Sequence, residues 1–161
     1  MGRDKSRLRL GGKTMLGQIR ATARASSLPV RVIRRDIVPR CGPLGGVYSA
    51  LKTTRKDAVL FLACDAPFVS VQLLERLAEK FLAEPDAWFV AHQGRVGFPF
   101  LLPKRCLRAV AGQLEQGELS LQSLAVQVKA KRLGLPRSLR LQIRNVNTPK
   151  EWESARRLWR D

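Results

Sequence analysis

The chain has 161 residues, enough for one compact domain with its own hydrophobic core. Apolar residues make up 45% and charged residues 27%, as in ordinary folded proteins, and no apolar run is long enough to predict a membrane-spanning helix. Lysine and arginine number 30 against 13 acidic residues, which gives a formal net charge of +17. Such a charge favours polyanionic ligands, whether nucleotide, nucleic acid, anionic lipid or acidic protein. A solvated surface that is merely rich in basic residues would give the same charge.

The first part of the chain alternates between helical and extended patterns. Residues 14–26 have apolar side chains at helical spacing and predict an amphipathic helix. Residues 29–36 are short and β-branched and predict a strand. The glycine-rich stretch GPLGG at 42–46 opens a second predicted helix, which runs to about Lys52. This alternation predicts an α/β layered sheet with mainly parallel strands.

The strongest strand pattern is the apolar run DAVLFLACD at 57–65, which is typical of a central strand covered on both faces. A helix is predicted over 70–84, with its leucines on one side. Two strands, 87–92 and 98–103, are separated by a glycine-containing turn, and helices are expected to fill 104–128.

The C-terminal part contains one more predicted strand and one more predicted helix. Residues 139–144 alternate strictly between apolar and polar side chains, which suits a half-exposed strand. Thr148, Pro149 and Glu151 form a capping-box pattern that begins the last helix. Its packing face is expected to contain Trp152, Ala155 and Trp159.

Asp65 is the first candidate for chemistry. It follows a buried strand pattern directly, and ligands of open α/β sheets bind outside the carboxyl ends of the strands. A carboxylate at that edge can hold Mg²⁺ together with phosphate oxygens. The alternative is an aspartate that begins a turn or caps the helix near Ser70.

Two glycine-containing segments are candidates for anion binding. In GPLGG, Gly42 and Gly45 would let backbone N–H groups approach an anion at a helix start, although a plain strand-to-helix turn gives the same pattern. In MGRDK, Lys5 could neutralise phosphate charge, or it could lie in a solvated basic N-terminal segment. His92 is the only histidine and has no nameable triad partner, which favours a solvated or structural role.

Taken in order, the stretches MGRDK, DIVPRCGPLGG, LACDAPFV and RNVNTPKEWE resemble the molybdenum cofactor guanylyltransferase family, a branch of the nucleotidyltransferases. The resemblance extends over almost the whole chain. It implies a single Rossmann-like, three-layer nucleotidyltransferase domain over 1–161. It also implies an enzyme that transfers GMP from GTP to the molybdopterin-bound molybdenum cofactor, forming the guanine dinucleotide cofactor and pyrophosphate.

The resemblance implies catalytic roles for Lys5 and Asp65. Lys5 would contact the GTP phosphates, and Asp65 would bind the Mg²⁺ cofactor and the same phosphates. Asp36 would recognise the nucleotide, with Gly42 and Gly45 in the adjoining nucleotide-binding segment. Phosphoryl-type transfer depends on positioning and charge neutralisation, which these residue types supply.

Asn145 and Asn147 match family asparagines near the molybdopterin substrate. The implied partners are GTP, the molybdopterin cofactor and accessory cofactor-biosynthesis proteins or molybdoenzymes, without a membrane. The three cysteines are odd in number and form no CxxC pair, which favours a reducing cytoplasm over a disulfide framework or a zinc site.

The sequence departs from the family pattern at its start. The opening strand and L-A-G-G loop of the family have no counterpart before MGRDK, so we expect an N-terminally shortened domain that binds GTP weakly. Leu119 also stands where many members have a basic residue. Two alternatives remain: a related nucleotidyltransferase with another nucleotide or acceptor, and a basic, non-catalytic nucleic-acid-binding module. The aromatic content of 6% and the absence of a helix-turn-helix or RNA-recognition signature argue against the second.

Overall fold

Four strands form the main sheet of the computed structural model, which describes residues 8–159. Their order across the sheet is β3 (Ala58–Phe61), β5 (Arg95–Pro103), β4 (Trp88–His92) and β6 (Lys131–Gly134). β5 pairs antiparallel with both β3 and β4, whereas β4 pairs parallel with β6. Consequently β3, β4 and β6 all run in one direction, and their carboxyl ends lie at the same edge of the sheet.

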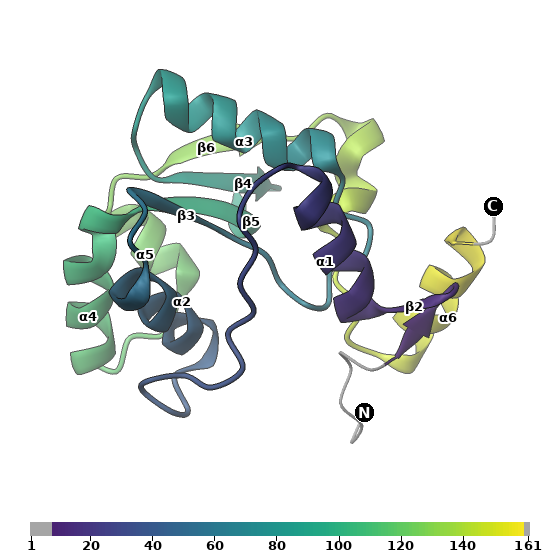
Figure 1. The fold of residues 1–161 in the computed structure, drawn as a ribbon, viewed down its shortest axis with the longest axis horizontal. Helices are drawn as coiled ribbons and strands as arrows, with labels where there is room; N and C mark the ends of the chain where they lie inside the picture. The colour runs from purple at the N-terminus through teal and green to yellow at the C-terminus, as the bar shows by residue number, and fades with distance from the viewer. Residues whose placement is uncertain (1–7, 160–161) are drawn as a thin grey trace.

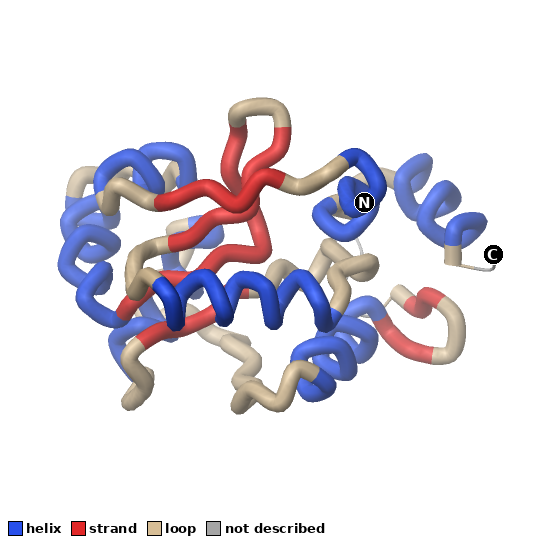
Figure 2. Tube along the Cα trace, turned by 90° about the horizontal axis from the view of Figure 1, so that it is seen from above, coloured by secondary structure: helices blue, strands red, loops and turns tan. Residues whose placement is uncertain are grey.

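Helices cover both faces of this sheet (Figure 1). Figure 2 shows the helices, in blue, on either side of the strands, in red. One face is covered by α2 (Gly42–Thr53), α4 (Leu107–Glu115) and α5 (Leu121–Gln127), with the short 3₁₀ helix η2 (Lys104–Cys106) before α4. The other is covered by α1 (Met15–Ala25) and α3 (Val71–Ala83). The predicted three-layer α/β class is therefore confirmed, with a mixed sheet in which β5 runs against the other three strands.

Aromatic rings fill the core between the sheet and α2. Phe100 of β5 stacks on Phe89 of β4 at a centroid distance of 4.5 Å and on Phe61 of β3 at 4.9 Å. Phe89 and Phe100 have no solvent exposure. Each such ring removes a large apolar area from water, so this stack is a main source of the free energy of folding.

A separate unit joins the first and last described segments. β1 (Arg9–Leu10) and β2 (Lys13–Thr14) form a hairpin, and α6 (Pro149–Leu158) lies beside it (Figure 1). Leu10, Met15, Val146 and Ala155 are buried together, with the two tryptophans of the last segment packed against them. Gly11 has φ of +64°, and a Cβ there would lie 2.7 Å from Trp159 Nε1, so both the backbone and the packing require glycine.

Side-chain caps fix the starts of several helices where the sequence predicts them. Thr14 Oγ1 accepts a hydrogen bond from the Gly17 N–H at 3.0 Å and begins α1. The predicted capping box at α6 is confirmed: Thr148 Oγ1 accepts from the Glu151 N–H, and Glu151 Oε2 accepts from the Thr148 N–H at 2.8 Å. The Asn147 N–H donates to the same carboxylate oxygen at 2.7 Å.

Two predicted strands are not formed. Residues 29–36 contain no strand, because no other strand among the described residues pairs with them. Residues 139–144 fall largely within the 3₁₀ helix η3 (Arg137–Ile143), which satisfies backbone groups locally, as when the Leu139 N–H donates to the Pro136 carbonyl. The run 57–65 gives only the short β3, which lies at one end of the sheet order rather than at its centre.

No helix within residues 8–159 combines the length and the apolar character needed to cross a membrane.

Candidate functional site

The glycine-rich segment forms the first turns of α2, and the Asp36 side chain lies against it. A Cβ on Gly45 would lie 2.8 Å from Asp36 Oδ2, and one on Gly46 would lie 3.5 Å from Asp36 Oδ1. The absence of a side chain at Gly45 is what allows the carboxylate to approach the helix, whereas a Cβ on Gly46 would make an ordinary van der Waals contact. The start of a helix is also electrostatically favourable for a carboxylate.

Ser49 fixes the segment that carries Asp36 onto α2. Its hydroxyl donates to the Gly45 carbonyl at 2.7 Å and accepts a hydrogen bond from the Ile37 N–H at 2.8 Å. Ser49 is buried, so both bonds are shielded from water. Cys41, the N-cap residue of α2, directs its thiol to the Pro39 carbonyl and does not cap the helix. Gly42 is exposed and has φ of +52°, a conformation that favours glycine.

Asp65 lies beyond the carboxyl end of β3, as the sequence predicts. It is half-buried, and its carbonyl oxygen accepts a hydrogen bond from the Val146 N–H at 2.8 Å. This bond brings Asn145 and Asn147, the two flanking residues, next to Asp65 in the fold. Two motifs about 80 residues apart in the sequence therefore meet at one edge of the sheet.

The alternative role for Asp65, capping the following helix, belongs instead to Ser70. Ser70 Oγ accepts a hydrogen bond from the Leu73 N–H at 3.2 Å and is the N-cap of α3. No cluster of three or more histidine, cysteine, aspartate or glutamate side chains suitable for a metal occurs within residues 8–159. Asp65 fits a Mg²⁺ ion that takes one carboxylate from the protein and its other ligands from phosphate and water.

The site residues predicted from the sequence lie in two groups in the fold. Asp36 and Gly45 are in contact, and Asp65 lies beside the segment of Asn145 and Asn147. Lys5 lies outside the described residues, so its predicted position near the other two groups stays a prediction.

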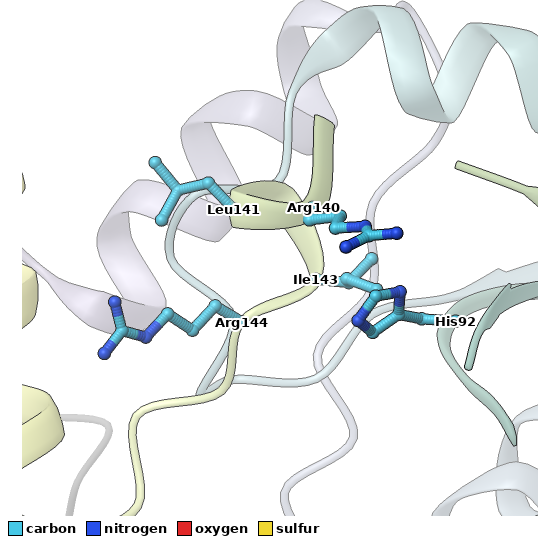
Figure 3. A pocket seen from close by; sticks show the side chains of 5 residues that line it. All are labelled: His92, Arg140, Leu141, Ile143 and Arg144. Atoms are coloured by element: carbon cyan, nitrogen blue, oxygen red, sulfur yellow. The ribbon is translucent and has the colours of Figure 1, made fainter. Parts of the chain in front are cut away.

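A pocket that sequence reasoning missed lies at the same edge of the sheet. It is lined by His92, the last residue of β4, and by residues of η3 and its C-cap (Figure 3). Its volume is ≈ 380 Å³. His92 and Arg140 point toward one another across it, whereas Arg144 extends away from this pair (Figure 3). No local sequence signal joins residues this far apart, and the predicted strand at 139–144 would have placed these arginines differently.

Solved structures of other proteins show which fold this chain has. The molybdopterin-guanine dinucleotide biosynthesis protein A from Archaeoglobus fulgidus matches 98% of this chain and 91% of its own, with a TM-score of 0.75 and 18% identity. The 2-C-methyl-D-erythritol 4-phosphate cytidylyltransferase from Thermus thermophilus matches 98% of this chain and 94% of its own, with a TM-score of 0.70 and 18% identity. The fold is that of the Rossmann-like α/β nucleotidyltransferases.

Sequence comparisons identify the family to which the chain belongs. Residues 20–131 match the MobA-like NTP transferase domain, and the chain belongs to this family. A probable molybdenum cofactor guanylyltransferase of Opitutus terrae is 29% identical over 179 aligned positions, covering 98% of this chain and 89% of that protein. The resemblance seen in the four sequence motifs is confirmed.

Two other relatives are matched over less of their length. A probable molybdenum cofactor guanylyltransferase of Flavobacterium johnsoniae is 30% identical over 118 residues, which cover 72% of this chain and 62% of that protein. A molybdenum cofactor guanylyltransferase of Pseudomonas putida is 38% identical over 110 residues, which cover 67% of this chain and 56% of that protein. The chain thus matches somewhat more than half the length of these two relatives.

Proposed function

We propose that this protein transfers GMP from GTP to the molybdopterin-bound molybdenum cofactor and releases pyrophosphate. The observation that carries the proposal is the packing of Asp36 on Gly45, because it joins two parts of the family motif at the start of one helix. The names of the relatives support the same activity, including the Opitutus terrae protein that matches almost the whole chain. The reaction would take place in the cytoplasm, with recipient or accessory proteins of molybdenum cofactor synthesis as further partners.

In this reaction the nucleotide would lie at the start of α2. Asp36, in a segment fixed through Ser49, would accept hydrogen bonds from the nucleotide, and Gly45 would keep its carboxylate close to the helix. Gly42, where a Cβ would meet nothing within 4 Å, would let the backbone at the start of α2 approach the nucleotide closely. Because the buried Ser49 hydroxyl fixes the backbone next to Asp36 through the Ile37 N–H, this segment loses less conformational entropy on binding a ligand, which favours selective recognition.

The transfer step needs charge neutralisation more than a reactive side chain. An oxygen of the acceptor attacks the α-phosphorus of GTP, and the bond from that phosphorus to the bridging oxygen of pyrophosphate breaks. Mg²⁺ bound with Asp65 would neutralise charge on the phosphates. Lys5 would hold the leaving pyrophosphate, and Asn145 and Asn147, beside Asp65, would orient the acceptor through their amide groups.

A panel of nucleotides tests this function. The midpoint of thermal unfolding is measured with Mg²⁺ and GTP, CTP, ATP or UTP, at concentrations reaching the millimolar range because weak binding is expected. GTP should raise the midpoint most, and Asp36→Asn should remove the difference between GTP and the other nucleotides. Stabilisation by CTP alone would reject guanylyl transfer and favour a related cytidylyltransferase, for which the Thermus thermophilus fold neighbour is a precedent.

A second measurement separates the metal role from nucleotide recognition. Asp65→Asn removes the carboxylate charge but keeps the side-chain size, so the Mg²⁺-dependent part of the GTP stabilisation should be lost. Full Mg²⁺-dependent stabilisation in this variant would remove Asp65 from the metal site.

A further inference from the structure

The pocket between β4 and η3 combines cationic groups with an apolar floor. His92 and Arg140 face one another, and Ile143 contributes the apolar side chain between them (Figure 3). Arg144 is at the other side of η3 and adds positive charge at the rim. A concave surface with low-dielectric walls strengthens the field of such charges.

Among the described residues, no carboxylate lies at ion-pair distance from the two arginines of this pocket, and Glu151 acts on Arg144 only at longer range. Within residues 8–159, neither Arg140 nor Arg144 forms an ion pair with a carboxylate, and the ion pairs that do occur involve Arg105 and Lys131 at the opposite edge of the sheet. The Arg140 and His92 side chains also make no hydrogen bond to other described residues. Their N–H donors are therefore available to a ligand, and a guanidinium matches the oxygens of a phosphate in a bidentate geometry.

The pocket adjoins the proposed site of transfer. Arg144 is the C-cap of η3 and precedes Asn145, and the next residue, Val146, donates to the Asp65 carbonyl at 2.8 Å. His92 ends β4, whose carboxyl end lies at the same edge of the sheet as that of β3. The pocket is thus built from β4 and η3, whereas the proposed nucleotide segment belongs to α2.

We propose that His92 and Arg140 bind a phosphate group of the acceptor substrate and that Arg144 contributes charge at the rim. This assignment rests on the proposed function, because a dinucleotide product requires that the acceptor present a phosphate oxygen to the α-phosphorus of the nucleotide. Arg140 and His92 hold the non-reacting oxygens of that phosphate, and the remaining oxygen attacks the α-phosphorus of the nucleotide. The triphosphate of GTP is the other group that could supply a phosphate to this pocket.

His92 provides a direct probe, because it is the only histidine and its imidazole proton resonances in NMR spectra belong to one site. Inorganic phosphate is titrated into the protein at constant pH, with chloride at equal ionic strength as the reference. The His92 resonances should shift saturably with phosphate in the wild type and should not do so in Arg140→Gln. Arg140 is exposed, so this substitution leaves the core unchanged.

The matched control is Arg108→Gln, which removes the same charge from an exposed position on α4. It should retain the saturable shift. The phosphate pocket would be overturned if the wild type showed no saturable shift. It would also be overturned if Arg108→Gln and Arg140→Gln lost the shift equally, because that result would mean that only net charge matters.

A third titration identifies the source of the phosphate. If GTP with Mg²⁺ leaves the His92 resonances in place and phosphate still shifts them in the presence of GTP, the pocket belongs to the acceptor. If GTP shifts them as phosphate does and the shift is lost in Arg140→Gln, the triphosphate occupies the pocket and the acceptor assignment is overturned. Guanylyl transfer itself is tested by the nucleotide panel, whose outcome does not depend on His92.

In a turnover assay, Arg140→Gln should raise KM for the acceptor by roughly tenfold or more, as expected for loss of a hydrogen bond between charged groups. KM for GTP should stay within about twofold of the wild type. A purely structural role for Arg140 would change both KM values together or lower kcat alone, and either result would contradict the assignment.

Discussion

Gly45→Ala tests whether the approach of Asp36 to α2 requires a position without a side chain. The added Cβ would lie 2.8 Å from Asp36 Oδ2 and 2.9 Å from the carbonyl oxygen of Val38. Both distances are well below a normal carbon–oxygen contact. The carboxylate could rotate away, but the Val38 oxygen belongs to the backbone, which can only move together with the segment that carries Asp36. Such overpacking typically costs about 1–3 kcal/mol of stability.

Gly112→Ala is the matched control. Gly112 also lies inside a helix, α4, and a Cβ there would meet nothing within 4 Å. Replacing glycine by alanine inside a helix stabilises it by roughly 0.5–1 kcal/mol, so Gly112→Ala should be more stable than the wild type. The same gain in helix stability applies when Gly45 is replaced by alanine, so it cancels when the stabilities of the two variants are compared. Gly45→Ala should therefore be less stable than Gly112→Ala by about 1–3 kcal/mol.

Thermal and urea-induced unfolding of the two variants measure this difference. In a domain of this size, each 1 kcal/mol corresponds to a Tm change of about 2–4 °C. Under the proposed function, Gly45→Ala should also lose the preference for GTP, because it displaces Asp36, whereas Gly112→Ala should keep it. Equal stability of the two alanine variants would refute the close packing of Asp36 on the helix.

Three further predictions concern the core, the buried thiol and the last helix. Phe100→Ala removes a fully buried ring that stacks on two others, so the free energy of unfolding in urea should fall by about 3–5 kcal/mol; a loss below about 1 kcal/mol would contradict the stacked core. Burial raises the pKa of the Cys106 thiol, so at neutral pH a disulfide reagent should modify the exposed Cys64 well before Cys106, and equal rates would count against this prediction. Backbone N–H groups at the start of α6 lower the pKa of Glu151 below its usual 4.5, so the folded state binds this proton at lower pH than the unfolded state does. The contribution of Glu151 to the free energy of unfolding is complete above pH 4.5 and declines as the pH falls through the folded-state pKa. Glu151→Gln should therefore lose less stability than the wild type on acidification. Parallel plots of unfolding free energy against pH for the two proteins would disprove the link.

Signals carried by neighbouring residues predicted the fold well. The capping box at Thr148 and Glu151 specifies a helix start through contacts three residues apart, and the structure contains both hydrogen bonds. The strand patterns at 29–36 and 139–144 failed for the opposite reason. A strand exists only where another strand pairs with it, and that partner is not encoded in the segment itself. Without one, residues 139–144 took a helical form that closes its own hydrogen bonds.

The site could be predicted only in part. Family motifs in the sequence named Asp36 and Asp65, but the packing of Asp36 on Gly45 and the bond between Val146 and Asp65 follow from the tertiary fold. The arrangement of His92 opposite Arg140 could not be predicted, because it depends on the 3₁₀ helix that the alternating pattern concealed.

The position of β3 at the end of the sheet has a consequence for the behaviour of the protein in solution. One long side of this strand pairs with β5, while no strand within residues 8–159 pairs with the other, and Ala58, Val59 and Leu60 remain partly exposed. Alternate amides along β3 should therefore exchange hydrogen with deuterium at very different rates. A free strand edge can also pair with another molecule, which the net charge of +17 opposes by mutual repulsion. Because salt screens that repulsion, self-association is expected to increase with ionic strength, and dilute buffers should keep the protein dispersed.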